Sequence, residues 1–196
     1  MQGIRQTLIF LTIVVTQLII VAQANNVTYL ITELCSHTPN HNLCISTLNM
    51  DHRTSAAKYK VDIAKILLFN VKDIASKTEN YILGLLWNRG IEEPMRQHLR
   101  SCMEIYHGKI KYLLYIIIHS MPRKDYDNNA LDSMSMKDHY DIAVANMAHL
   151  LGFVKLCNHE FVTVVSPIAD DTKAMDDLSK VTNDIIRYLH FFPPPN

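Results

Sequence analysis

Four residues in the stretch CSHTPNHNLC could bind a metal ion, because cysteine and histidine side chains are common zinc ligands. They are Cys35, His37, His41 and Cys44. Their spacing, C-x-H-x3-H-x2-C, matches none of the usual patterns of zinc sites. The two cysteines could instead close a short loop as a disulfide, with the histidines incidental. The redox compartment in which the chain folds decides between these alternatives.

The N-terminus has the features of a cleavable secretory signal. Arg5 precedes a long apolar stretch that ends near Ala22 and Ala24, the small residues expected at a cleavage site. The alternative is a membrane anchor, but the stretch is short for a span of roughly twenty residues. We therefore expect residues 1–24 to be a signal peptide and the mature chain to be secreted, with no membrane attachment.

An oxidising compartment predicts that the four cysteines form two disulfides, without a metal site or another cofactor. Asn26 lies in an N-V-T triplet and is a candidate glycosylation site. The whole chain has 19 Lys+Arg and 19 Asp+Glu, with both signs spread along it. This balance argues against nucleic acid as a partner, since such proteins present a dense basic face.

Apolar residues recur every three or four positions in four segments, which predicts helices that bury one face. These stripes are Val61, Ala64, Leu68, Val71, Ala75, Thr78, Ile82 and Leu85; Met95, Leu99, Cys102, Tyr106, Ile110, Leu113 and Ile117; Ala143, Met147, Leu150, Val154, Cys157 and Phe161; and Met175, Leu178, Thr182, Ile185 and Leu189. The pattern predicts an all-α protein with an up-down-up-down four-helix bundle.

Breaks in the pattern separate the four helices. Gly90 is expected to stop the first helix, Pro122 follows the second, and Pro167 separates the third from the fourth. Acidic Glu92 and Glu93 suit the start of the second helix. Short connections make neighbouring helices antiparallel, which predicts a bundle over residues 54–191 and a Pro-rich tail over 192–196.

Cys102 and Cys157 lie in the middle of the second and third stripes. Antiparallel neighbours would bring these positions together, which favours a Cys102–Cys157 disulfide and leaves Cys35 to pair with Cys44. Residues 25–53 are expected to form a helical hairpin held by this second disulfide. Its first helix would end at Cys35, and its second would pack through Leu43, Thr47 and Met50.

The usual motifs of enzymes are missing: the sequence has no G-x-S-x-G, no H-E-x-x-H and no phosphate-binding loop. Asp170–Asp171 and Asp176–Asp177 suit an exposed helix start better than acid–base catalysis. We therefore expect a protein that is not an enzyme.

The sequence resembles the plant invertase/pectin methylesterase inhibitor family in three stretches. They are CSHTPNHNLCISTL at 35–48 with DHR at 51–53, LRSCMEIYHGKI at 99–110 and LCNHEF at 156–161. In that family the first cysteine pairs with the second and the third with the fourth. The resemblance implies a secreted inhibitor in the apoplast or cell wall that forms a one-to-one complex with its enzyme through the middle bundle helices. The expected interface consists of Arg100, Glu104, Lys111, Tyr115, Asp141, His149 and Lys155.

The target is expected to be pectin methylesterase, whose active-site cleft the bundle would occlude. Lys124-Asp125-Tyr126-Asp127 resembles the Gly-Asp-Tyr of pectin methylesterase inhibitors more than the Pro-Lys-Phe of invertase inhibitors. The Thr38-Pro39-Asn40 turn favours invertase, which is the alternative. A further alternative is a non-inhibitory carrier that holds an apolar ligand inside the bundle, since the stripes are rich in methionine. The last is a structural or signalling protein that has kept the fold alone.

Overall fold

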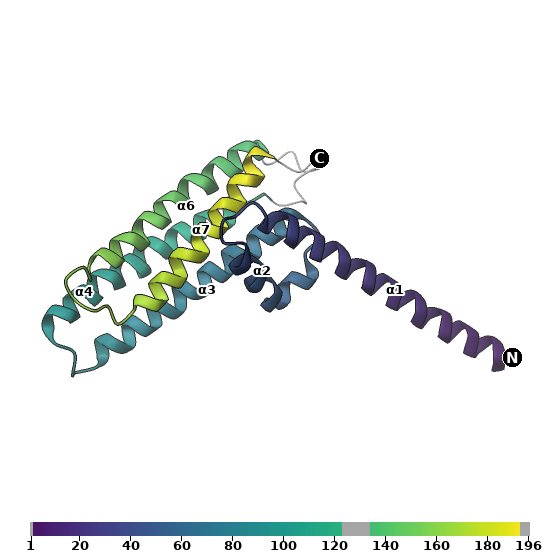
Figure 1. Ribbon diagram of the computed structural model, residues 1–196, viewed down its shortest axis with the longest axis horizontal. Helices are drawn as coiled ribbons and strands as arrows, with labels where there is room; N and C mark the ends of the chain where they lie inside the picture. Colours follow the sequence, from purple (N-terminus) through teal and green to yellow (C-terminus); the bar gives the residue numbers. More distant parts are fainter. Residues whose placement is uncertain (1, 123–133, 193–196) are drawn as a thin grey trace.

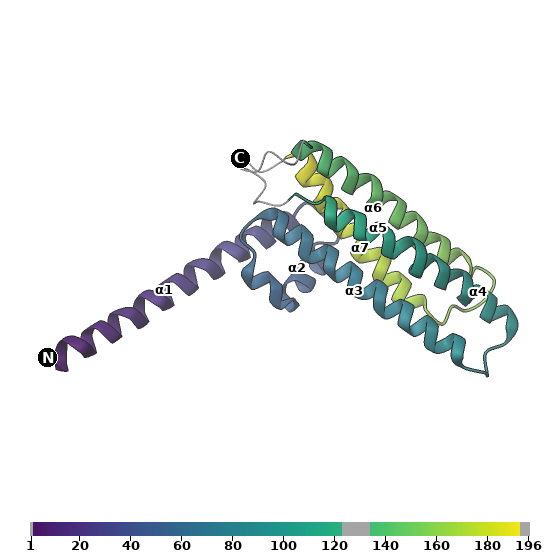
Figure 2. The ribbon, with the colours of Figure 1, turned by 180° about the vertical axis from the view of Figure 1, so that it is seen from behind.

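The computed structural model describes residues 2–122 and 134–192, apart from the side chains of residues 2–10 and 18–25. This described part is entirely helical and has no strand (Figures 1 and 2). Its elements are α1 (Gln2–Cys35), α2 (His41–Met50), the 3-10 helix η1 (His52–Ala56), α3 (Lys60–Trp87), α4 (Glu93–Glu104), the π-helix η2 (Ile105–Ile110), α5 (Lys111–Ser120), α6 (Met136–His159) and α7 (Ala169–Phe191).

Four long helices form the predicted bundle. In order, they are α3, the continuous helix made of α4, η2 and α5, then α6 and α7, and each packs on two neighbours (Figure 1). All residues of the four stripes are buried except Leu85 and Met95, which are partly buried. The predicted fold class is therefore confirmed, because the hydrophobic spacing selected the faces that exclude water.

The first bundle helix ends where expected but by a different mechanism. α3 ends at Trp87, yet Gly90 has no positive φ, so the predicted glycine stop is wrong. Asn88 takes an extended backbone instead, and its side chain accepts a hydrogen bond from the backbone N–H of Gly90. The guanidinium of Arg96 donates to the carbonyl oxygens of Leu86 and Asn88, which satisfies groups that a helix end leaves without partners.

The second bundle helix contains a π-helix that sequence analysis did not predict. Residues Ile105–Ile110 widen the helix between α4 and α5. The sequence feature that indicates this π-helix is the spacing of three buried residues, Cys102, Tyr106 and Ile110, which are separated by two successive steps of four residues. A regular α-helix would rotate its buried face away from the core over two such steps. The wider turn keeps Tyr106 and Ile110 both fully buried.

Both predicted disulfides are present, with S–S distances of 1.96 Å for Cys35–Cys44 and 2.05 Å for Cys102–Cys157. The metal-site alternative for the first pair is therefore excluded, because its sulfurs bond to each other. His37 stacks instead on the ring of Tyr188, with ring centroids 3.7 Å apart.

The second helix of the hairpin packs through a different face from the predicted one. Cys44 and Leu48 are its buried residues, while Met50 is 80% exposed. The disulfide turns Cys44 inward, and Leu48 follows one helical turn later on the same side. Leu43 and Thr47 lie at the edge of this face and are partly buried.

The first helix of the hairpin ends at Cys35 as expected, but it runs back without a break to Gln2. Its N-terminal part extends away from the bundle in both views (Figures 1 and 2). None of the helices among the described residues combines the length and apolar character needed to cross a membrane. Asn26 is exposed on this helix. Signal cleavage after Ala24 and a glycan on Asn26 stay predictions.

Asp51 ties the hairpin to the bundle. Its side chain is 5% exposed and accepts hydrogen bonds from the backbone and side chain of Arg53 and from Asn70 on α3. The hydrogen bonds from Arg53 outweigh the opposing effect of burial and lower the pKa of Asp51 from 3.8 to about 2. The ionised carboxylate is therefore part of the folded state.

Acidification is expected to remove the contribution of Asp51 to stability. A carboxyl group with a lowered pKa in the folded state stabilises it above its usual pKa, and this stability is lost as the pH falls from about 4 to about 2. Unfolding free energies measured by urea titration across this range should fall less steeply for Asp51→Asn than for the wild type. Glu104→Gln, which removes an exposed carboxylate, is the control and should follow the wild type.

The two disulfides should differ in how much they contribute to the free energy of unfolding. They span sequence separations of 9 and 55 residues, and a longer closed loop restricts the unfolded chain more. Replacing both members by serine should lower the unfolding free energy by about 3 kcal/mol for Cys35–Cys44 and about 4 kcal/mol for Cys102–Cys157. Urea unfolding of the two double variants measures this. A larger loss from the short loop would contradict the entropic account.

Candidate functional site

The two middle helices of the bundle run side by side and antiparallel. The Cys102–Cys157 disulfide joins α4 to the C-terminal part of α6. At the other end, the Nδ1 atom of His139 on α6 lies 2.9 Å from the carbonyl oxygen of Ser120 on α5. Figure 2 shows α5 and α6 alongside each other. The outer surface of this pair is the place where the predicted interface residues should meet.

All seven predicted interface residues are exposed, but the structure does not bring them all onto one surface. Lys111 turns toward α3, where its Nζ lies 2.5 Å from Oε2 of Glu79. Burial works to raise the pKa of Glu79, but hydrogen bonds from Lys111 and His107 outweigh it and lower this pKa. Lys111 is therefore at the α3 edge of the pair and its charge is already matched.

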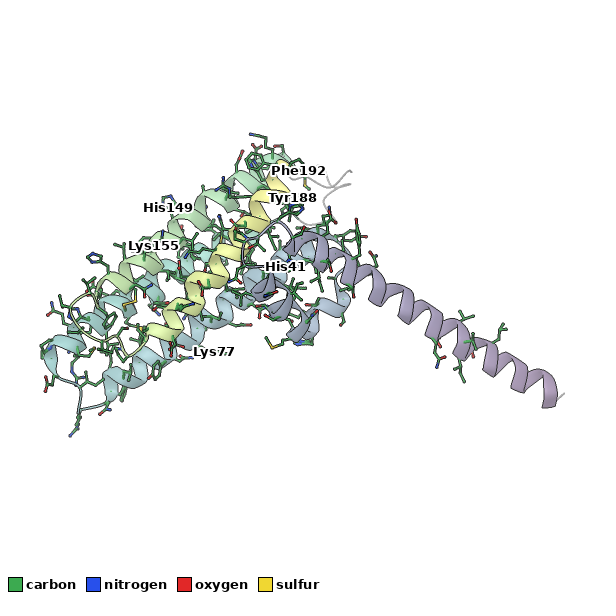
Figure 3. The ribbon with its side chains drawn as sticks, in the orientation of Figure 1. His41, Lys77, His149, Lys155, Tyr188 and Phe192 are labelled. Carbon is green, nitrogen blue, oxygen red and sulfur yellow. A yellow bond between two sulfur atoms is a disulfide. The ribbon has the colours of Figure 1, made fainter. Side chains whose placement is uncertain are left out.

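The three predicted residues on α6 divide between two sides of that helix. Asp141 lies toward α7, since its Oδ1 is 2.8 Å from Nε2 of His190. Lys155 is fourteen residues further on, which returns it to within about 40° of Asp141. His149 lies within about 20° of Glu160, which faces α4 through His98 at 3.5 Å. Only His149 of these three is thus on the side of α4 and α5; Figure 3 labels it with Lys155 along α6.

The remaining predicted interface residues lie on the outer side of the second bundle helix, which consists of α4, η2 and α5. Arg100 pairs with Glu93 at 2.8 Å, Glu104 is exposed, and the ring of Tyr115 packs on His119 with centroids 4.0 Å apart. Two further exposed residues were missed: Tyr112, 64% exposed, and Leu156, 55% exposed. The spacing of Tyr112 three residues before Tyr115 could have indicated the first, because such residues share a helix face.

We call the resulting surface the middle-helix face. It is formed by the exposed residues on the outer side of α4, α5 and the adjoining side of α6: Arg100, Glu104, Tyr112, Tyr115, His149 and Leu156. Tyrosine and arginine are enriched where proteins bind other proteins, because they combine apolar area with polar groups.

The charge along the middle helices is unevenly distributed. The sequence has no Asp or Glu between Ile105 and Ser120 or between Ile142 and His159, whereas it has Lys109, Lys111 and Lys155 there. The chain as a whole is formally neutral, so its carboxylates lie mostly elsewhere. Of these lysines, however, Lys111 is paired with Glu79 and Lys155 lies on the α7 side of α6, so the outer surface of the middle helices is poor in carboxylates rather than strongly basic.

A metal site and a ligand pocket are the other kinds of site that such a bundle could hold. Within the described ranges, no group of three or more His, Cys, Asp or Glu side chains is placed to hold a metal ion. A groove of about 720 Å³ lies between α2, η1, α3 and α7. It is outside the bundle core, and the carboxylates of Asp51, Asp73, Asp170 and Asp177 contribute to its lining. Leu43, Met50, Ile74 and Leu178 line it as well, and the carrier hypothesis, which places an apolar ligand inside the bundle, stays a prediction.

The sequence profile of one protein family, described as plant invertase/pectin methylesterase inhibitor, matches residues 29–186. This match includes all four cysteines, the first three bundle helices and α7 as far as Ile186. The chain belongs to the plant invertase/pectin methylesterase inhibitor family. It is a family of enzyme inhibitors rather than of enzymes, in agreement with the expectation drawn from the missing catalytic motifs.

Relatives of this inhibitor family member include one curated protein and two solved structures. The chain is 39% identical over 72 residues to "Cell wall / vacuolar inhibitor of fructosidase 1" of Arabidopsis thaliana, a match that covers 37% of this chain and 33% of the relative. It therefore spans about a third of that relative's length. A pectin methylesterase inhibitor from Arabidopsis thaliana has a TM-score of 0.55 at 16% identity, covering 85% of this chain and 97% of its own.

A second structure, of a mutant form of a pectin methylesterase inhibitor from Arabidopsis, has a TM-score of 0.52 at 21% identity and covers 83% of this chain and 95% of its own. These two structures show the shared helical fold. The segment Lys124-Asp125-Tyr126-Asp127, on which the predicted target depended, and the tail residues 193–196 lie outside the described residues.

Proposed function

We propose that the chain is a secreted inhibitor that docks its middle-helix face across the active-site cleft of a plant carbohydrate-modifying enzyme, in a one-to-one complex. The observation that carries this proposal is the family match over residues 29–186. The composition of the face supports it, because Tyr112, Tyr115 and Leu156 expose large apolar area without forming part of the core.

An inhibitor that acts by covering an active-site cleft needs a surface of fixed shape and needs no catalytic groups. The disulfide between α4 and α6 and the buried stripes hold the two middle helices in a fixed relation. A preorganised surface loses little conformational freedom on binding, which favours affinity. The lack of carboxylates along Ile105–Ser120 and Ile142–His159 also means that these segments would not repel an enzyme with an acidic cleft.

Two targets are consistent with the family description, and we rank invertase first and pectin methylesterase second. The curated relative is an inhibitor of fructosidase and is 39% identical over the matched residues. The two solved pectin methylesterase inhibitors are less than 25% identical to this chain and support the fold rather than the target. Pectin methylesterase is favoured by the sequence Lys124-Asp125-Tyr126-Asp127, which resembles the Gly-Asp-Tyr of pectin methylesterase inhibitors.

Secretion to the cell wall is part of the proposal. The features of residues 1–24 and the two disulfides favour an oxidising route, and the curated relative is described as a cell wall or vacuolar inhibitor.

The function can be tested by titrating the purified, oxidised protein against both enzymes. We expect stoichiometric inhibition of a plant acid invertase, measured as release of glucose from sucrose, and weaker or no inhibition of a plant pectin methylesterase, measured as release of methanol. Protein reduced and alkylated under denaturing conditions is the control. Inhibition of the esterase alone would reverse the ranking, and inhibition of neither would refute the proposed function.

The two tyrosines of the middle-helix face should contribute strongly to binding. Tyr112→Ala combined with Tyr115→Ala is expected to raise the inhibition constant at least about tenfold, because exposed tyrosines are frequent hot spots. Stability should change by only about 0.5 kcal/mol, as for other surface substitutions. Tyr81→Ala is the matched control: this tyrosine is 47% exposed on α3 and should leave inhibition unchanged. Equal effects of the two variants would place the docking surface elsewhere.

A further inference from the structure

Glu79 is a buried carboxylate that joins α3 to the π-helix of the second bundle helix. Its side chain is 7% exposed. Its Oε1 lies 2.7 Å from Nδ1 of His107, and its Oε2 lies 2.5 Å from Nζ of Lys111. Both oxygens therefore have a partner, and both partners come from η2 or from the first residue of α5.

The two partners reach Glu79 because of the π-helix. A π-helix contains one more residue per turn than an α-helix and is found often at functional sites. The extra residue turns the following segment back by about 100° relative to a regular helix. This rotation brings Lys111 to the α3 side and so determines the direction in which Tyr112 and Tyr115 leave the helix.

Glu79 cannot itself touch a docked protein, since almost all of its side chain is covered by this chain. Its partners are at the surface: His107 is 72% exposed and Lys111 is 43% exposed. A buried charge that is fully hydrogen-bonded fixes its partners more strongly than a neutral group, because hydrogen bonds to ions are stronger. Loss of the charge would leave the ammonium group of Lys111 without an anionic partner.

From this geometry we propose that Glu79 is a positioning residue for inhibition: it holds the π-helix and thereby sets the orientation of the tyrosines on the middle-helix face. This inference rests on the proposed function. It assigns a role in docking to a residue that lies on neither of the two middle helices and makes no contact with the target.

The variant Glu79→Gln keeps the shape of the side chain and removes its charge. We expect its inhibition constant, against whichever enzyme the wild type inhibits, to rise about tenfold through misplacement of the face. Backbone amides of residues 105–112 should exchange with deuterium faster than in the wild type. Glu79→Asp keeps the charge and should recover at least half of the loss in affinity.

Glu33→Gln is the matched control. Glu33 is also a partly buried carboxylate with two partners, Lys60 and Tyr188, but it lies on α1, away from η2. Both Glu33→Gln and Glu79→Gln are expected to lower the melting temperature, because each removes a partly or fully buried ion pair, but Glu33→Gln should leave the inhibition constant unchanged.

Equal inhibition by wild type and Glu79→Gln would overturn the proposal, as would equal losses from the Glu33 and Glu79 variants. A wild type that inhibits neither enzyme would refute the proposed function and the docking role with it. In that case the exchange of residues 105–112 would still decide whether Glu79 holds the π-helix.

Discussion

The covalent link between Cys102 and Cys157 is the constraint on which the middle-helix face depends. It joins α4 to α6 near one end, while His139 meets the backbone of Ser120 near the other. Two helices held at both ends cannot slide or rotate against each other without breaking these contacts. The exposed residues between the ends consequently form one surface of fixed shape, which is the requirement for a protein that acts by covering another.

A second constraint acts through the backbone of the helix itself. The stripe from Cys102 to Ile110 cannot stay in the core on a regular α-helix, and the π-helix resolves this conflict. The same widening brings His107 and Lys111 to Glu79. Core packing and surface orientation are thus coupled: the sequence spacing that keeps Tyr106 buried also decides how the next turn faces the solvent.

Several particular features could be predicted from the sequence. The buried residues of all four bundle helices followed from their spacing, and the disulfide partners followed from where Cys102 and Cys157 lie in those stripes. Other features could not be predicted. The inward side of α2 depended on the disulfide at Cys44, and the end of α3 depended on Arg96 reaching back from the next helix. These outcomes arise from contacts between elements rather than within one.

The sequence by itself determined the fold class and the core, because hydrophobic periodicity acts through local geometry that repeats along the chain; the family followed from the resemblance of residues 35–53, 99–110 and 156–161. Only the tertiary structure decided which exposed residues share a surface. Lys111 and Lys155 have the spacing of outward-facing residues, yet one turns to Glu79 on α3 and the other lies on the α7 side of its helix. The spacing of apolar residues within one helix shows which of its residues face solvent. Which residues of other helices lie beside them on the same surface depends on how the helices pack.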